Sequence, residues 1–370
     1  MALTPEDQLR IHVLLQNQPQ AVRIEEGSMT FFGLTPEGTA SIPLHPDVGN
    51  ERYLKHVREM LSTHVLGSPG GYPVYLKRWT RMGQTSGGRM ADLLLLGEPE
   101  AVMAVANAQE LDLELATRTW WAATNAEAQP EVARHLLRHA SVREAPLGQE
   151  VANFLLEYLP FLEEPQVILL TATLILQDEL LSEAQVMSLW NRARNKSAIQ
   201  VAFLQARAER LPELPPPHRF SAEYQSLIET LVEQNNVLAM RLRWLWSPQG
   251  QGFVQLVERA LNKVSDEDLV YPLLESIGGW FAHRPRTMHR DIESLQAAAE
   301  QASQEDAAQA LVQQAPELES TIAAVALLGE VTESICFRSI LHSGAVGSQL
   351  RRKMKTEAEP ILQALHQVQV

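Results

Sequence analysis

The chain has 370 residues, with 45 acidic and 31 basic side chains and a formal net charge of −14 at neutral pH. Its hydrophobic content of 45% is ordinary for a globular protein, which excludes a largely disordered chain. The negative charge disfavours nonspecific attraction to nucleic acid or to an anionic membrane surface.

The cysteine content and the apolar runs indicate a cytoplasmic protein. Cys336 is the only cysteine, so the chain has no internal disulfide and no zinc site built from cysteines alone. Its apolar neighbours predict a buried, structural thiol. Residues 1–10 are acidic where a secretion signal would be cationic and then apolar. The longest apolar run, residues 167–176, is well short of the roughly 20 residues that cross a bilayer. We therefore expect no membrane partner.

The N-terminal residues predict a helix, a small sheet and a second helix. Thr4 followed by Pro5 and two acidic residues is a strong helix start, so we expect a helix to about residue 16. Turn-forming residues then separate three short predicted strands, at 21–24, 29–34 and 39–44. Asn50 is the expected cap of the second helix, whose apolar residues recur at helical spacing.

The segment from Gly67 to Arg89 departs from the acidic character of the chain. It has four cations and no acidic residue, and three aromatic residues are interleaved with the cations. Glycines and prolines at its ends predict a loop. Guanidinium groups pair with phosphate or carboxylate, and exposed rings stack on unpaired bases. This predicts a partner-binding segment made of Tyr72, Tyr75, Lys77, Arg78, Trp79, Arg81 and Arg89.

An alternative interpretation of this segment stays open. Bulky aromatic residues are usually buried, so the three rings would then anchor the loop to the protein body while the cations stay solvated or pair with acidic neighbours. The glycine spacing lacks the lysine and hydroxyl of a nucleotide-binding phosphate loop. Nucleotide hydrolysis is therefore not expected.

The residues after Arg89 predict one helix after another, punctuated by prolines at residues 99, 130, 146, 160, 165, 248, 272 and 285. Two long helical patterns, 291–314 and 316–341, end the chain. We expect a mainly α fold, either a HEAT-like solenoid or an irregular bundle, with a small N-terminal β-meander. The proline run at 215–217 predicts a linker. The expected domains are an N-terminal module at 1–88 and two halves of a helical array at 89–212 and 218–370.

Three further groups of residues have a composition that could form a site. Glu131, His135 and His139 recur every fourth residue, as the ligands of a metal ion on a helix would. The arginines between them favour an ordinary polar helix face, so we expect no metal and no cofactor. A cationic cluster at 283–290 is typical of a helix end. A second cluster at 351–355 is followed by Glu357 and Glu359, as on a solvated helix surface.

Over most of its length the chain resembles the DsrS family, which consists of soluble accessory proteins of sulfur-oxidising bacteria encoded beside the reverse-acting dissimilatory sulfite reductase. The resemblance is specific in the run from Tyr53 to Gln84, which includes LGSPGGYPVYLKRWTRMGQ at 66–84. Residues 94–105 and the pair Trp120 and Trp121 fit the same family. The resemblance implies a cytoplasmic helper protein and supplies no catalytic residues.

The resemblance implies a noncatalytic accessory or regulatory protein of bacterial sulfur oxidation. We expect it to bind a protein or RNA partner, and we expect no DNA partner. The alternative is an enzyme with a pocket near the N-terminal module, in which His56 or His64 acts as acid or base. A purely structural scaffold is the third class.

Overall fold

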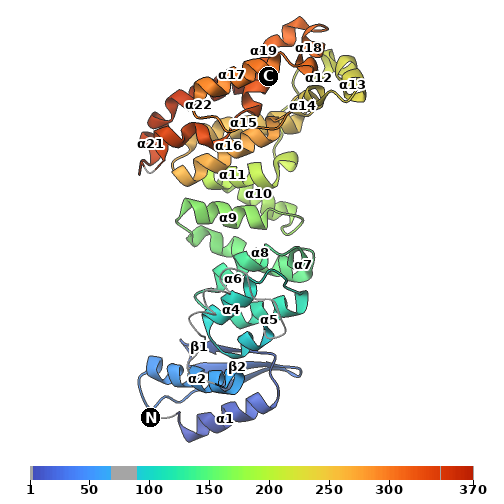
Figure 1. Cartoon of the computed structure of the whole chain (residues 1–370). Coiled ribbons are helices and arrows are strands. Elements are labelled where there is room, and N and C mark those ends of the chain that lie inside the picture. The colour runs from blue at the N-terminus through green and yellow to red at the C-terminus, as the bar shows by residue number, and fades with distance from the viewer. Residues whose placement is uncertain (1–2, 68–89, 342, 370) are drawn as a thin grey trace. The chain divides into compact units, whose positions relative to one another are not determined.

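The computed structural model describes residues 3–67, 90–341 and 343–369. It is mainly helical with one small sheet near the N-terminus, as predicted (Figure 1). Contacts within the chain define two compact units, Met1–Pro160 and Phe161–Val370. The domain boundaries expected at residues 88, 212 and 218 stay predictions.

The N-terminal unit begins with the predicted helix and meander. Helix α1 spans Pro5–Gln16, and the Thr4 hydroxyl accepts a hydrogen bond from the Asp7 N–H, as expected of its cap. The strands pair antiparallel in the order β1-β2-β3, and their bounds are Ala21–Glu25, Thr30–Thr35 and Gly38–Pro43. Helix α2 spans Asn50–Leu66, and Gly49 rather than Asn50 is its N-cap.

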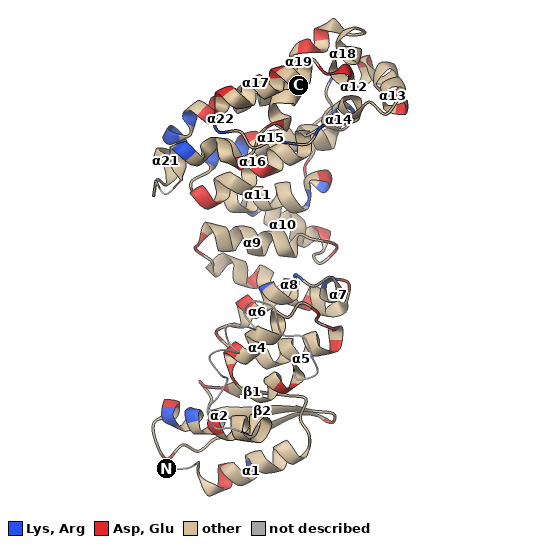
Figure 2. Ribbon diagram, in the orientation of Figure 1, with Lys and Arg blue, Asp and Glu red and all other residues tan. Residues whose placement is uncertain are grey.

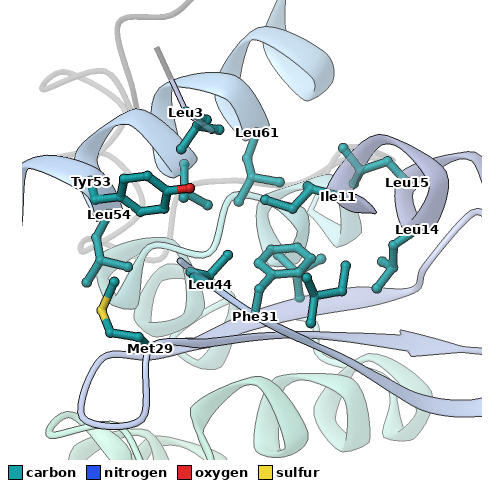
Figure 3. Close-up of a cluster of buried hydrophobic side chains, with 13 residues drawn as sticks. Leu3, Ile11, Leu14, Leu15, Met29, Phe31, Leu44, Tyr53, Leu54 and Leu61 are labelled. Atoms are coloured by element: carbon teal, nitrogen blue, oxygen red, sulfur yellow. The ribbon is translucent and has the colours of Figure 1, made fainter. Parts of the chain in front are cut away.

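A hydrophobic core joins α1, the sheet and α2 (Figure 3). Ile11 of α1, Phe31 of β2 and Leu61 of α2 are fully buried in it. Burying each such side chain contributes about 1.5–3 kcal/mol to folding. Gly33 lies close to α1: a Cβ there would be 2.4 Å from a Leu14 methyl group, so a larger residue would require the Leu14 side chain to shift.

A buried polar network also ties α1 to α2. The Asp7 carboxylate is fully buried and accepts hydrogen bonds from the Tyr53 hydroxyl at 2.5 Å and from the His45 backbone N–H at 2.7 Å. The His45 ring contacts the same carboxylate through Nδ1 at 3.2 Å. These bonds compensate for removing a charged group from water.

Helices complete the N-terminal unit. A single proline occupies the first position of α4 and of α8 and the second position of α6, which confirms the predicted role of prolines at helix starts. Helix α5 packs against β1, α4 and α6. The elements after the sheet are η1 Ala91–Leu95, α4 Pro99–Ala106, α5 Leu113–Ala123, α6 Gln129–Leu136, α7 Ala140–Arg143, α8 Pro146–Tyr158 and η2 Leu159–Phe161.

The C-terminal unit is built from helices around α11, whose residues 198–204 are all buried. Helix α11 contacts α9, α10, α15 and α16. Residues 211–218, which include the proline run, form no helix or strand. The first helices are α9 Pro165–Ile175, α10 Glu183–Ala193, α11 Ser197–Ala206, η3 Ala208–Arg210, α12 Phe220–Glu223, α13 Gln225–Glu233, α14 Val237–Leu245, α15 Pro248–Lys263 and α16 Glu267–Phe281.

The two long helices predicted at the end of the chain are wrong, because both patterns are broken. The elements there are α17 Ile292–Ser303, α18 Asp306–Val312, η4 Pro316–Leu318, α19 Glu319–Gly329, η5 Glu333–Cys336, α20 Phe337–Ile340, α21 Gly347–Lys353 and α22 Lys355–Gln367. Tertiary bonds hold the break after α19: the Glu330 carboxylate accepts from Arg284 and the Val331 carbonyl accepts from Arg286.

Pro272 does not separate two helices as predicted, because it lies inside α16. A proline inside a helix removes one backbone hydrogen bond. The buried leucines at 269, 273 and 274 pack this helix into the unit and favour its continuation.

No single helix in the described part of the chain is both long and apolar enough to cross a membrane. One pair, Pro316–Gly329 with Glu333–Ile340, meets the length and composition only as a span bent by 80°.

Candidate binding cleft in the N-terminal unit

The seven residues predicted to bind a partner, from Tyr72 to Arg89, lie outside the residues that the structure describes. Their role stays a prediction. The candidate site described below is a different part of the N-terminal unit.

A cleft of about 760 Å³ opens beside the sheet. Its walls come from four segments that are far apart in the sequence: residues 22–28 of β1 and the turn after it, Arg58 of α2, residues 97–102 at the start of α4, and residues 122–132 from the end of α5 into α6. Ligand pockets are commonly about 300–1,000 Å³, so this cleft has room for a small molecule or for a few residues of a peptide.

Two residues with positive φ shape the walls. Asn125, between α5 and α6, has a φ of 62°, a conformation that asparagine tolerates better than most residues. Gly97, before α4, also has a φ of 62°, and a Cβ there would lie 3.1 Å from side-chain atoms of Ile24 and Leu61. The chain therefore turns sharply at both places and leaves the cleft open between the turns.

The cleft is acidic. Its lining residues include two arginines, Arg23 and Arg58, and five glutamates, at positions 25, 26, 98, 127 and 131. Five carboxylates less two guanidinium groups leave a formal charge of −3 on the wall. A concave site with one sign of charge concentrates ions of the opposite sign.

The arginines are held by neighbouring groups. Arg58 forms an ion pair with Glu26 at 2.5 Å and donates from Nε to the Gly97 carbonyl at 3.3 Å. Arg23 lies between two rings, 4.6 Å from the centroid of Phe32 and 4.8 Å from that of Trp121. It also donates to the Trp121 carbonyl at 3.2 Å. Both cations are thus fixed parts of the wall.

The carboxylates fall into paired and unpaired groups. Glu25 accepts hydrogen bonds from the Ser28 hydroxyl and from the Asn125 side chain, and these bonds lower its pKa, so it is ionised at neutral pH. Glu127 and Glu131 are exposed, and neither forms a hydrogen bond or an ion pair within the described residues. These two carboxylates are the ones that a cationic ligand would meet first.

The neighbouring residues Trp120 and Trp121 have separate roles. Trp120 is buried, donates to Glu150 at 2.7 Å and packs edge-on against Phe154, so it fills space between helices. Trp121 faces the sheet instead, where its indole donates to the Thr39 hydroxyl and its ring covers Arg23.

The histidines predicted for catalysis lie away from the cleft. His56 and His64 are both in α2 and are not among the residues that line it. The Nδ1 atom of His56 contacts Glu59 at 3.1 Å, and His64 is exposed.

The spacing of Glu131, His135 and His139 does not place the three on one helix. Helix α6 ends at Leu136, and the ring of His139 faces the Ala106 carbonyl at 3.2 Å. Burial lowers the pKa of His135. Within the described residues, no three histidine, cysteine, aspartate or glutamate side chains are grouped as metal ligands would be.

The cationic cluster at 283–290 follows the end of α16 at Phe281, as the sequence predicted. Arg284 pairs with Glu330 and Glu305, each at 2.6 Å, and Arg286 pairs with Glu275 at 2.9 Å. Both guanidinium groups are therefore already paired with carboxylates of the same chain. Cys336 is fully buried, and burial raises the pKa of its thiol to about 12, which fits the predicted structural role.

The fold and the cleft define a mainly helical protein with an acidic cleft in its N-terminal unit. Comparisons of the chain with family models, with curated proteins and with solved structures find no match.

Proposed function

We propose that the protein is a noncatalytic accessory protein whose N-terminal cleft binds a cationic segment of a protein partner. The observation that carries the proposal is the acidic cleft, with two exposed carboxylates that form no hydrogen bond or ion pair within the described residues. Lysine or arginine side chains of a partner would pair with Glu127 and Glu131, while its backbone would lie along the wall.

The same charge favours a protein over RNA as the occupant. Phosphates placed in this cleft would be repelled by the five glutamates. The described residues that line it include no histidine or cysteine. Its serine, Ser28, donates to Glu25, whose lowered pKa makes that carboxylate a weak base, so binding is a simpler use of the cleft than catalysis.

The resemblance to DsrS suggests the setting. It supports a regulatory or accessory role in the cytoplasm, with the partner drawn from the sulfur-oxidation system. The basic segment at 67–89 would be a second contact with the same assembly.

A binding assay with a labelled peptide tests the proposal. A fluorescent peptide rich in arginine and lysine is titrated with the protein, and its anisotropy gives Kd. Exposed ion pairs contribute about 0.2–1 kcal/mol each, so the double variant Glu127→Gln with Glu131→Gln should weaken binding about two- to thirtyfold.

The matched control removes two exposed carboxylates elsewhere in the unit, Glu144→Gln with Glu157→Gln, and should keep the wild-type Kd. Equal affinities for wild type and the cleft variant would contradict the proposal. Tighter binding of an RNA oligonucleotide than of the peptide, lost in the cleft variant, would replace a protein partner with RNA.

A further inference from the structure

The C-terminal unit has a cationic surface in an otherwise acidic chain. Arg351, Arg352 and Lys353 form the last turn of α21, and Lys355 is the first residue of α22. Met354 between them is buried, so the two helices meet at a fixed junction. Figure 2 shows basic residues gathered where α21 meets α22.

The sequence predicts that Glu357 and Glu359 balance the charge of these cations. In the structure only one of the two carboxylates is exposed beside them. Glu357 is buried, and its carboxylate accepts a hydrogen bond from the Ser339 hydroxyl. Glu359 is therefore the one exposed carboxylate of this pair. Residues 351–359 therefore have four cationic side chains and one exposed carboxylate, which gives this stretch a net positive charge at its surface.

Most of these cations are available to a ligand. Arg351 donates to the Val264 carbonyl at 2.9 Å, which fixes its side chain at the end of α15. Arg352, Lys353 and Lys355 are exposed, and none of the three forms an ion pair or side-chain hydrogen bond within the described residues.

The cationic surface borders a cleft of about 320 Å³ between α15 and the α21–α22 junction. Leu261, Met354 and Leu362 supply apolar lining, while Arg351, Lys355 and Glu359 supply the charged lining. An apolar hollow with cations beside it matches a ligand that has an apolar side chain next to carboxylates.

We propose that this cleft binds an acidic peptide segment of a protein partner, with an apolar side chain in the hollow and carboxylates on Arg352, Lys353 and Lys355. A peptide fits better than nucleic acid for two reasons. The described lining residues include no aromatic ring on which a base would stack. The net charge of −14 also repels a long polyanion, whereas a short acidic segment meets mainly the local cations.

This inference does not rest on the proposed function, because the surface belongs to the other unit and has the opposite charge. The experiment uses the full chain and a fluorescent peptide in which aspartate and glutamate flank a central leucine. The double variant Arg352→Gln with Lys355→Gln should weaken binding about two- to thirtyfold. The control Arg192→Gln removes an exposed cation of α10 and should leave Kd unchanged.

A change in the peptide separates the apolar contact from the charge. Replacing the central leucine with serine should weaken binding to wild type, since the hollow would then hold a polar group. Equal affinity of the two peptides, or equal binding by wild type and the double variant, would overturn the proposal. Tighter binding of a single-stranded oligonucleotide, lost in the double variant, would also overturn it by assigning the surface to nucleic acid.

Discussion

At the residue scale, single buried charges hold distant segments together. Glu330 is nearly fully buried and accepts from Arg284 at 2.6 Å and from His289 at 2.9 Å. Arg284 also pairs with Glu305 and donates to the Ala298 carbonyl. One carboxylate thus joins the loop after α16 to the break after α19.

Replacing Glu330 with glutamine should lower the free energy of unfolding by about 2–4 kcal/mol, because removing one partner of a buried ion pair leaves the other without full compensation. The control is Glu305→Gln, since Glu305 is 46% exposed and its pair should contribute no more than about 1 kcal/mol. Urea unfolding followed by circular dichroism measures both. Similar losses for the two variants would show that burial of Glu330 is not the decisive feature.

Asp7 should give the protein a measurable acid sensitivity. Burial raises the pKa of Asp7, but hydrogen bonds from the His45 backbone, the Tyr53 hydroxyl and the His45 ring outweigh that effect and hold it below its ordinary value of 3.8. A lowered folded-state pKa stabilises the protein above the unfolded value, and this contribution is lost as pH falls through the folded value.

Asp7→Asn should therefore be less stable than wild type at pH 7, and the difference should shrink below about pH 4. Thermal unfolding of the two proteins between pH 7 and pH 3 checks this. A difference in stability that stays constant over the whole range would contradict the assigned role of the Asp7 carboxylate.

At the element scale, the close approach of α16 to the segment after α19 limits the size of the residue at position 278 of α16. A Cβ at Gly278 would lie 1.9 Å from the Val331 carbonyl oxygen, whereas a Cβ at Gly279 would meet no atom within 4 Å. The two glycines are neighbours in one helix and differ in what they face.

Gly278→Ala should therefore destabilise the protein by about 1–3 kcal/mol through overpacking. Gly279→Ala should stabilise it by up to about 1 kcal/mol, because alanine has the higher helix propensity. Chemical unfolding of both variants tests the pair. Equal effects of the same sign would mean that the contact with Val331 does not limit the size of the residue at 278.

Local signals allowed some elements to be predicted and left others out of reach. Helix α1 and the meander were predicted because Thr4, Pro5 and the turns at 26–28 and 36–38 are short-range features. The break after Gly329 was missed because it depends on bonds to Arg284 and Arg286, which are more than forty residues away in sequence.

The cleft was missed for the same reason. Glu25 and Asn125 are joined by a hydrogen bond across 100 residues, and Arg23 meets Trp121 across 98. No spacing rule connects such positions in a single sequence. The basic segment at 67–89 was visible in the sequence because its charge and composition differ from the rest over a short range.

At the scale of the whole molecule, the two proposed sites have opposite charge and belong to different units. An acidic cleft lies in Met1–Pro160 and a cationic one in Phe161–Val370. A protein with both would hold two differently charged segments of its partners at once. This arrangement suits an accessory protein that brings other proteins together.

The central claim is that the acidic cleft is the place where a cationic segment binds. Photo-crosslinking tests this directly: an arginine- and lysine-rich peptide with a photoreactive group is bound to the full chain and irradiated, and the linked residues are identified by mass spectrometry. We expect crosslinks within residues 22–28 and 122–132, and we expect them to be lost when Glu127 and Glu131 are both replaced by glutamine. Crosslinks that fall outside the residues lining the cleft, or that persist unchanged in that variant, would contradict the claim.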